Sequence, residues 1–220
     1  MSEKSTLEPT VFSKKYLILN EIFNALTHGI GLGLSIAGLV ILLLKGSNNG
    51  TTLAIVSYAI YGSTLILLYL CSTLYHSLAF TRAKKIFKTF DHMSIFLLIA
   101  GTYTPYTLIA IGGTLGWIIF GIVWSIAFIG VIYKAFWINH LQKYSTWLYI
   151  MMGWICVFAL KPIYLGLGYN GFLLLFLGGL SFTVGAIFYS LRNVKFMHVV
   201  WHLFVLAGTI FMYFSILFYV

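Results

Sequence analysis

The chain has 220 residues, of which 61% are hydrophobic and 8% are charged, and its net charge is +9. A water-soluble domain is about half apolar and about a quarter charged, so this composition excludes an ordinary soluble globular protein. In a soluble protein the basic excess would suggest nucleic acid as a partner. Here the basic residues fall between long apolar runs, where membrane orientation explains them better. We therefore expect an integral membrane protein with no nucleic-acid partner.

Seven apolar runs follow one another along the chain. Several reach the roughly 20 residues that cross a bilayer as a helix, and they are continuous rather than alternating, which disfavours membrane-spanning strands. The fifth run is the shortest and is expected to end at Lys161 and Pro162. The sequence predicts an all-α membrane protein, a bundle of seven transmembrane helices at residues 22–44, 52–80, 90–111, 114–133, 145–160, 171–190 and 197–219.

The orientation of this bundle follows from its basic residues. Seven spans place the termini on opposite sides of the membrane. With the N-terminus inside, only Lys45 and Lys161 of the 13 Lys and Arg residues fall outside, which leaves 11 inside. Cytoplasmic loops carry the excess of Lys and Arg, so we expect a cytoplasmic N-terminus and an external C-terminus. The expected location is the plasma membrane of the cell, with multiple passes.

The segment before the first span has its own pattern. Phe12, Tyr16, Leu19 and Phe23 form an apolar stripe at helical spacing. A short helix on the cytoplasmic membrane surface would show this stripe, and so would a simple extension of the first span. We expect residues 1–20 to form a cytoplasmic segment and residues 21–220 to form the transmembrane domain.

Polar side chains from several spans fall at one depth, in the cytoplasmic half. Ser72 and His76 lie near the end of the second span, and Asp91 lies near the start of the third. The last span opens with His198 and His202, which are one helical turn, about 6 Å, apart. Ionisable groups within a bilayer cost about 3 kcal/mol or more and usually mark function. The first span adds three more polar residues on one helical face: Glu21, Asn24 and His28.

Three imidazoles and a carboxylate at one depth predict a zinc site. His76, His198 and His202 would be the ligands, and three protein ligands leave one coordination position open, as in catalytic zinc sites. Asp91 would act as the base for water that zinc activates. Ser72 would orient a ligand or donate a hydrogen bond to a developing oxyanion.

Each of these residues also has a structural explanation. H-x-x-x-H alone is weak evidence, and the pair lacks the glutamate of H-E-x-x-H proteases. His76 could bond a backbone carbonyl at the interface, and Asp91 could neutralise nearby basic residues. Capping or anchoring of the first helix could explain the three polar residues of the first span. Two further histidines, His92 and His140, are not expected among the ligands.

In order along the chain, these motifs resemble those of a known family. The stretch E-x-x-N-x-x-T-H begins at Glu21, S-x-x-x-H begins at Ser72, Asp91 opens the third span and H-x-x-x-H begins at His198. From Glu21 to the C-terminus the sequence resembles the bacterial hemolysin III proteins of the progestin and adipoQ receptor superfamily. The resemblance implies seven helices, a cytoplasmic N-terminus, zinc held by the three histidines, and Asp91 and Ser72 close to a zinc-bound water.

The resemblance also sets out the candidate functions. Adiponectin receptors of this superfamily are associated with ceramide hydrolysis, and the related alkaline ceramidases carry a similar set of Ser, His and Asp residues. The first hypothesis is therefore a zinc-dependent hydrolase of a membrane-lipid amide or ester. A receptor or membrane-homeostasis sensor with structural zinc is the second. A cytolytic, pore-forming protein is the third, although the spans are too apolar to line an obvious water-filled pore. A proton-relaying transporter is disfavoured, because the polar groups stop in the cytoplasmic half.

Overall fold

The chain is predominantly helical over the residues that the computed structural model describes, which are 12–49, 51–137, 142–191 and 193–220, with turns at 78–83 and 193–196. Within these ranges six helical stretches are long and apolar enough to cross a membrane. The chain is therefore a multi-pass integral membrane protein. Its elements are α1 (Lys14–Asn49), α2 (Thr52–Ser77), α3 (Lys84–Pro105), the π-helix η1 (Tyr106–Ile111), α4 (Gly113–Trp137), α5 (Gln142–Gly153), the 3₁₀-helix η2 (Trp154–Ala159), α6 (Leu160–Ser190) and α7 (Met197–Tyr219).

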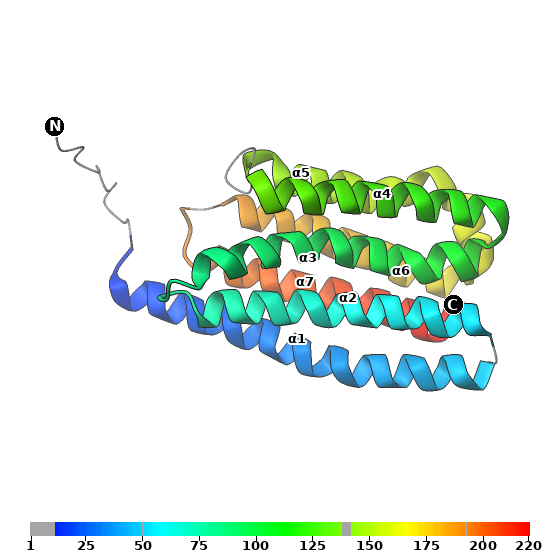
Figure 1. Ribbon diagram of the computed structural model, residues 1–220, viewed down its shortest axis with the longest axis horizontal. Helices are drawn as coiled ribbons and strands as arrows, with labels where there is room; N and C mark the ends of the chain where they lie inside the picture. Colours follow the sequence, from blue (N-terminus) through cyan, green and yellow to red (C-terminus); the bar gives the residue numbers. More distant parts are fainter. Residues whose placement is uncertain (1–11, 50, 138–141, 192) are drawn as a thin grey trace.

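The helices lie side by side along the long axis of the molecule (Figure 1). α2 packs between α1 and α3, α3 also contacts α4, and α7 packs against both α6 and α1. The start of α1 and the end of α7 lie at opposite ends of the bundle (Figure 1). This arrangement brings the beginnings of α1, α3 and α7 and the end of α2 to one end.

The surface of the bundle is apolar, as lipid contact requires. Phe158, Phe136 and Leu165 are 92%, 74% and 72% exposed, and many further Ile, Leu and Phe side chains point outward from the helices. A soluble protein rarely exposes apolar surface on this scale. The interior instead contains tyrosines whose hydroxyls find partners inside the bundle, such as Tyr69, which bonds Thr209 Oγ1 at 2.6 Å. Polar side chains such as Tyr69 are thus accommodated in the interior of the bundle, and large apolar side chains cover its surface.

The stretch from α5 through η2 to α6 runs the length of the bundle and returns. Gly168, with φ +66° and ψ −177°, interrupts the helical geometry inside α6. Near this break Gly166 lies against the carbonyl of Ala110 in η1, and Gly171 lies against Tyr219 at the end of α7. Glycine takes this positive φ without the strain that a Cβ would cause. The chain therefore reverses direction at Gly168.

Several helix boundaries differ from the predicted spans. The helix does not end at Lys161 and Pro162, because both residues lie in the first turn of α6, where a proline is tolerated. α3 starts at Lys84 rather than near residue 90, and α4 continues to Trp137. α1 begins at Lys14, so residues 14–20 extend the first helix without a break. The position of that extension relative to the membrane surface stays a prediction.

Candidate metal centre

Three histidines from two helices meet at the end of the bundle where α7 begins. His76 on α2 and His198 and His202 on α7 each offer one ring nitrogen, and these three atoms lie within 4.8 Å of one another. The four-residue spacing on α7 puts both of its histidines on the face toward α2. His76 and His202 are buried at 4% and 2% exposure. The predicted ligand set is therefore brought together.

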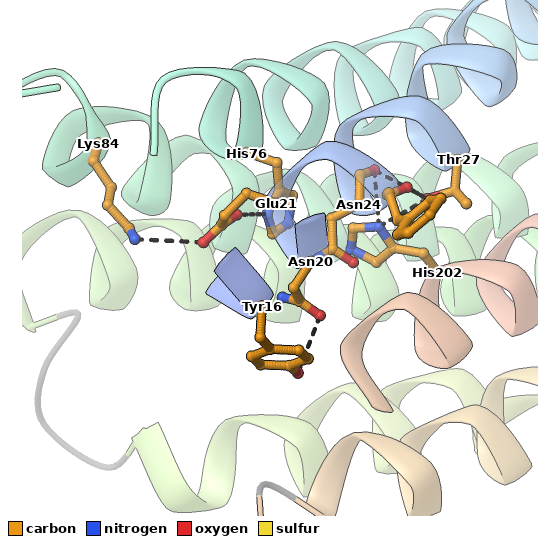
Figure 2. A network of polar contacts seen from close by, with 9 residues as sticks. Tyr16, Asn20, Glu21, Asn24, Thr27, His76, Lys84 and His202 are labelled. Atoms are coloured by element: carbon orange, nitrogen blue, oxygen red, sulfur yellow. Dashed lines mark hydrogen bonds and ion pairs between the residues drawn. The ribbon is translucent and has the colours of Figure 1, made fainter. Parts of the chain in front are cut away.

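A carboxylate orients the first of these rings. Glu21 Oε2 on α1 accepts from His76 Nδ1 at 2.6 Å, while Glu21 Oε1 lies 3.6 Å from Lys84 Nζ. Figure 2 shows the Glu21 side chain between His76 and Lys84. Because Nδ1 carries the proton donated to Glu21, a neutral His76 ring has its lone pair on Nε2. That atom is buried and has no hydrogen-bond partner among the described residues.

Backbone and hydroxyl oxygens orient the ring of His202. Its Nδ1 lies 3.2 Å from the Asn24 carbonyl oxygen and 3.3 Å from Thr27 Oγ1, as Figure 2 shows. The Thr27 hydroxyl itself donates to the carbonyls of Phe23 and Asn24, so its oxygen acts as an acceptor toward the ring. His202 Nδ1 is therefore the protonated nitrogen of a neutral ring, and Nε2 keeps the lone pair. His76 and His202 both present the nitrogen that a metal needs.

The remaining first-span residues also lie beside the cluster. The His28 ring stacks on His202 with centroids 3.5 Å apart and 12° between planes, and its edge meets Tyr69. Asn24 contributes its backbone carbonyl to His202, whereas its buried amide group has no hydrogen-bond partner within the described ranges. Neither ring nitrogen of His28 has one either. These polar atoms are enclosed next to the three histidines.

Asp91 and Ser72 face a cavity that also reaches the histidines. The cavity has a volume of about 180 Å³ and is lined at its polar end by His198 and His202 as well. The Asp91 carboxyl lies near Ser72 and within electrostatic range of His76. Ser72 Oγ is buried and makes no hydrogen bond of normal geometry with any described residue. Apolar side chains of α2, α3, α6 and α7 continue the cavity away from this end, among them Leu68, Leu98, Ile163, Phe172, Phe182 and Val205.

The structure adds participants that the sequence did not assign. Thr27 belongs to the first-span motif E-x-x-N-x-x-T-H. Its three-residue spacing from Asn24 could have indicated that both residues lie on the same helical face. The pairing of Lys84 with Glu21 could not be recognised in the sequence, because Lys84 lies in a run of basic residues. His92 also lines the cavity, although it is absent from the metal-ligand group. His140 lies outside the described residues.

Comparisons with known proteins show the family to which the chain belongs. The family model described as haemolysin-III related matches residues 16–213. The chain is 47% identical to Hemolysin-3 of Bacillus cereus over 220 residues, covering 100% of this chain and 98% of that protein. It is 47% identical to the Hemolysin-3 homolog of Bacillus subtilis (strain 168) over 204 residues, or 93% and 96% of the two chains. It is 26% identical to the monocyte to macrophage differentiation factor of Homo sapiens over 163 residues, or 71% and 67%.

The fold and the site thus define the class of protein, which is a helical multi-pass membrane bundle with a buried histidine cluster. Within that class, the chain belongs to the haemolysin III-related family. The predicted resemblance is confirmed, including its wider link to proteins of the progestin and adipoQ receptor type.

Proposed function

We propose that this chain is a zinc-dependent hydrolase of a membrane-lipid amide or ester. The observation that carries the proposal is the convergence of three imidazoles, two of which, His198 and His202, also line the polar end of a largely apolar cavity. An acyl chain would occupy the apolar part, and the carbonyl to be cleaved would then lie beside Asp91 and Ser72. The plasma membrane is the proposed location.

The donor set suits zinc. Neutral imidazole nitrogens are preferred zinc ligands, and three protein ligands leave a position for substrate or water. The unpartnered Nε2 of His76 supports this assignment, because an unpaired buried nitrogen is costly unless something binds it. His76, His198 and His202 would hold the ion. When bound, zinc polarises a carbonyl and makes water a stronger nucleophile at neutral pH.

The chain's own residues supply the remaining chemistry. The Asp91 carboxylate accepts a proton from the water that attacks the carbonyl carbon. It then returns this proton to the departing amine or alcohol, so that the carboxylate is regenerated. The Ser72 hydroxyl, which has no normal hydrogen bond among the described residues, donates to the carbonyl oxygen as negative charge develops there. The apolar walls hold the acyl chain in register.

The test combines metal content with turnover. Purified wild type should contain about one zinc per chain, and His76→Ala, His198→Ala and His202→Ala should lose it. Asp91→Asn should retain zinc but lose hydrolysis of lipid amides and esters by about 100-fold or more, as removal of a general base does. Metal-free wild type, prepared without chelators, would overturn the proposal. Retained function in Asp91→Asn with zinc bound would instead assign structural zinc in a receptor or sensor.

We also propose that the bundle crosses the membrane seven times, with the N-terminus in the cytoplasm. A straight helix of residues 142–190 would measure roughly 70 Å, more than twice the roughly 30 Å hydrocarbon core. The reversal at Gly168 therefore supports two crossings by this stretch. The opposite ends reached by α1 and α7 support an odd number of crossings (Figure 1). The positions of the basic residues support the cytoplasmic N-terminus.

Cysteine labelling tests this topology. In a variant with Cys71 and Cys156 changed to serine, Arg82→Cys should react with an impermeant maleimide only after the cells are opened. Lys45→Cys should react in intact cells. The reverse pattern would overturn the orientation, and equal accessibility of the two positions would show that α2 does not cross the membrane, which would overturn the seven crossings.

A further inference from the structure

A second polar cluster lies beside the histidine site and has a different composition. Lys134, near the end of α4, is fully buried at 0% exposure and donates through Nζ to Ser145 Oγ on α5. A buried ammonium needs compensation for the hydration that it has lost. A neutral serine hydroxyl supplies a hydrogen bond but no opposite charge.

Two more basic side chains gather at this point. Lys88 precedes His92 by one turn of α3 and so lies on the same face of that helix, and Lys88 and Lys134 both lie within electrostatic range of the His92 ring. Tyr149 OH donates to the His92 carbonyl at 3.0 Å and so ties α5 to this turn of α3. His92 Nδ1 is buried and has no hydrogen-bond partner in the described part of the chain. α3 and α4 thus bring together two ammonium groups and an imidazole whose Nδ1 has no partner among the described residues, and α5 packs against them through Ser145 and Tyr149.

The acidic residues within the described ranges are engaged elsewhere. Glu21 pairs with His76 and Lys84, and the Asp91 carboxyl lies near Ser72 and His76. No ion pair between described residues involves Lys88, His92 or Lys134. Like charges at short range in a medium less polar than water repel one another, so this cluster would be stabilised by an anion from outside the chain.

The position of the cluster of Lys88, His92 and Lys134 indicates which kind of anion it would bind. His92 and Ser145, the hydrogen-bond partner of Lys134, line the same cavity as Asp91, His198 and His202. An anion bound at this wall would lie at the polar end of a space suited to an acyl chain. Lysine ammonium groups bind phosphate as compact point charges. We propose that Lys88, His92 and Lys134 form a binding site for a phosphate group, and specifically for the phosphate of a lipid whose acyl chain occupies the cavity. This site goes beyond the proposed hydrolase, because binding requires no turnover.

Lipid binding to the purified, metal-loaded protein tests the proposal. The probes are phosphatidylglycerol and a diacylglycerol with the same acyl chains, measured by native mass spectrometry in detergent. Wild type should bind the phosphate-bearing lipid at least about tenfold more tightly, which corresponds to one charge-assisted hydrogen bond. Lys88→Gln and Lys134→Met should each remove most of this preference. Lys85→Gln is the matched control, because Lys85 is an exposed lysine of the same helix.

Competition with inorganic phosphate distinguishes the two sources of the anion. Displacement of the lipid at millimolar phosphate would support a site open to soluble phosphate as well, and no displacement would support a site specific to lipid phosphate. Equal binding of both lipids by wild type would overturn the proposal. So would an unchanged preference in Lys88→Gln, whose half-buried position lets the variant fold even if Lys134→Met does not. A failed hydrolase with an intact lipid preference would leave this inference standing.

Discussion

Removal of the Glu21 carboxylate should weaken zinc binding even though Glu21 is not a ligand. The contact from Glu21 Oε2 to His76 Nδ1 is 2.6 Å, and the two side chains are 19% and 3% exposed. A carboxylate in this position fixes the ring and increases the basicity of the other nitrogen, and its loss typically lowers metal affinity by about 10- to 100-fold. Glu21→Gln keeps an acceptor oxygen, so its zinc affinity should fall by about tenfold. Glu21→Ala removes the acceptor, so its zinc affinity should fall by about 100-fold, which corresponds to about 2.7 kcal/mol.

Lys84→Gln provides the matched control for this effect. Lys84 is the other charged partner of Glu21, but it lies 3.6 Å away and its side chain is 39% exposed. Exposed pairs of this kind contribute about 0–1 kcal/mol, so zinc affinity should change by less than about fivefold. The assay is competition for zinc against a fluorescent chelator in detergent, with folding followed by size-exclusion chromatography. Wild-type affinity in folded Glu21→Ala would refute the role of His76 as an oriented ligand.

The helical content was predictable because lipid offers no hydrogen-bond partners to the backbone. Backbone polar groups within a bilayer must be satisfied inside the helix, so long apolar runs have few alternatives. The predicted span at residues 197–219 coincides with α7. Its four-residue histidine spacing required only helical geometry to place both rings on one face. The convergence of His76 followed from hydropathy and orientation, which fix depth along a helix.

The contacts between helices were not predictable in the same way. The sequence predicted a reversal between the spans at 145–160 and 171–190, but hydropathy did not show that α6 already begins at Leu160 and that its helical geometry is interrupted at Gly168. The role of Glu21 was equally open, because spacing cannot distinguish a helix cap from a partner on another helix. The predicted fourth span ended at residue 133 and so left Lys134 in a loop. In the structure Lys134 belongs to α4, is buried and donates to Ser145 of α5. Each of these features depends on side-chain packing across helices.

Two further substitutions test the packing that holds the site. Tyr103→Phe removes the hydroxyl that donates to the Gly153 carbonyl at 2.7 Å and accepts from the Cys156 amide at 2.8 Å. Two such bonds should lower the free energy of unfolding by about 1–3 kcal/mol, measured by denaturation with SDS. Gly185→Ala should displace α7 and weaken zinc binding, because the new Cβ would lie 2.6 Å from Phe204 Cβ. Gly179→Ala on the same helix meets only an ordinary contact at 3.8 Å and should bind zinc as wild type does. Equal zinc affinity in the two alanine variants would show that the α6–α7 contact does not position the histidines.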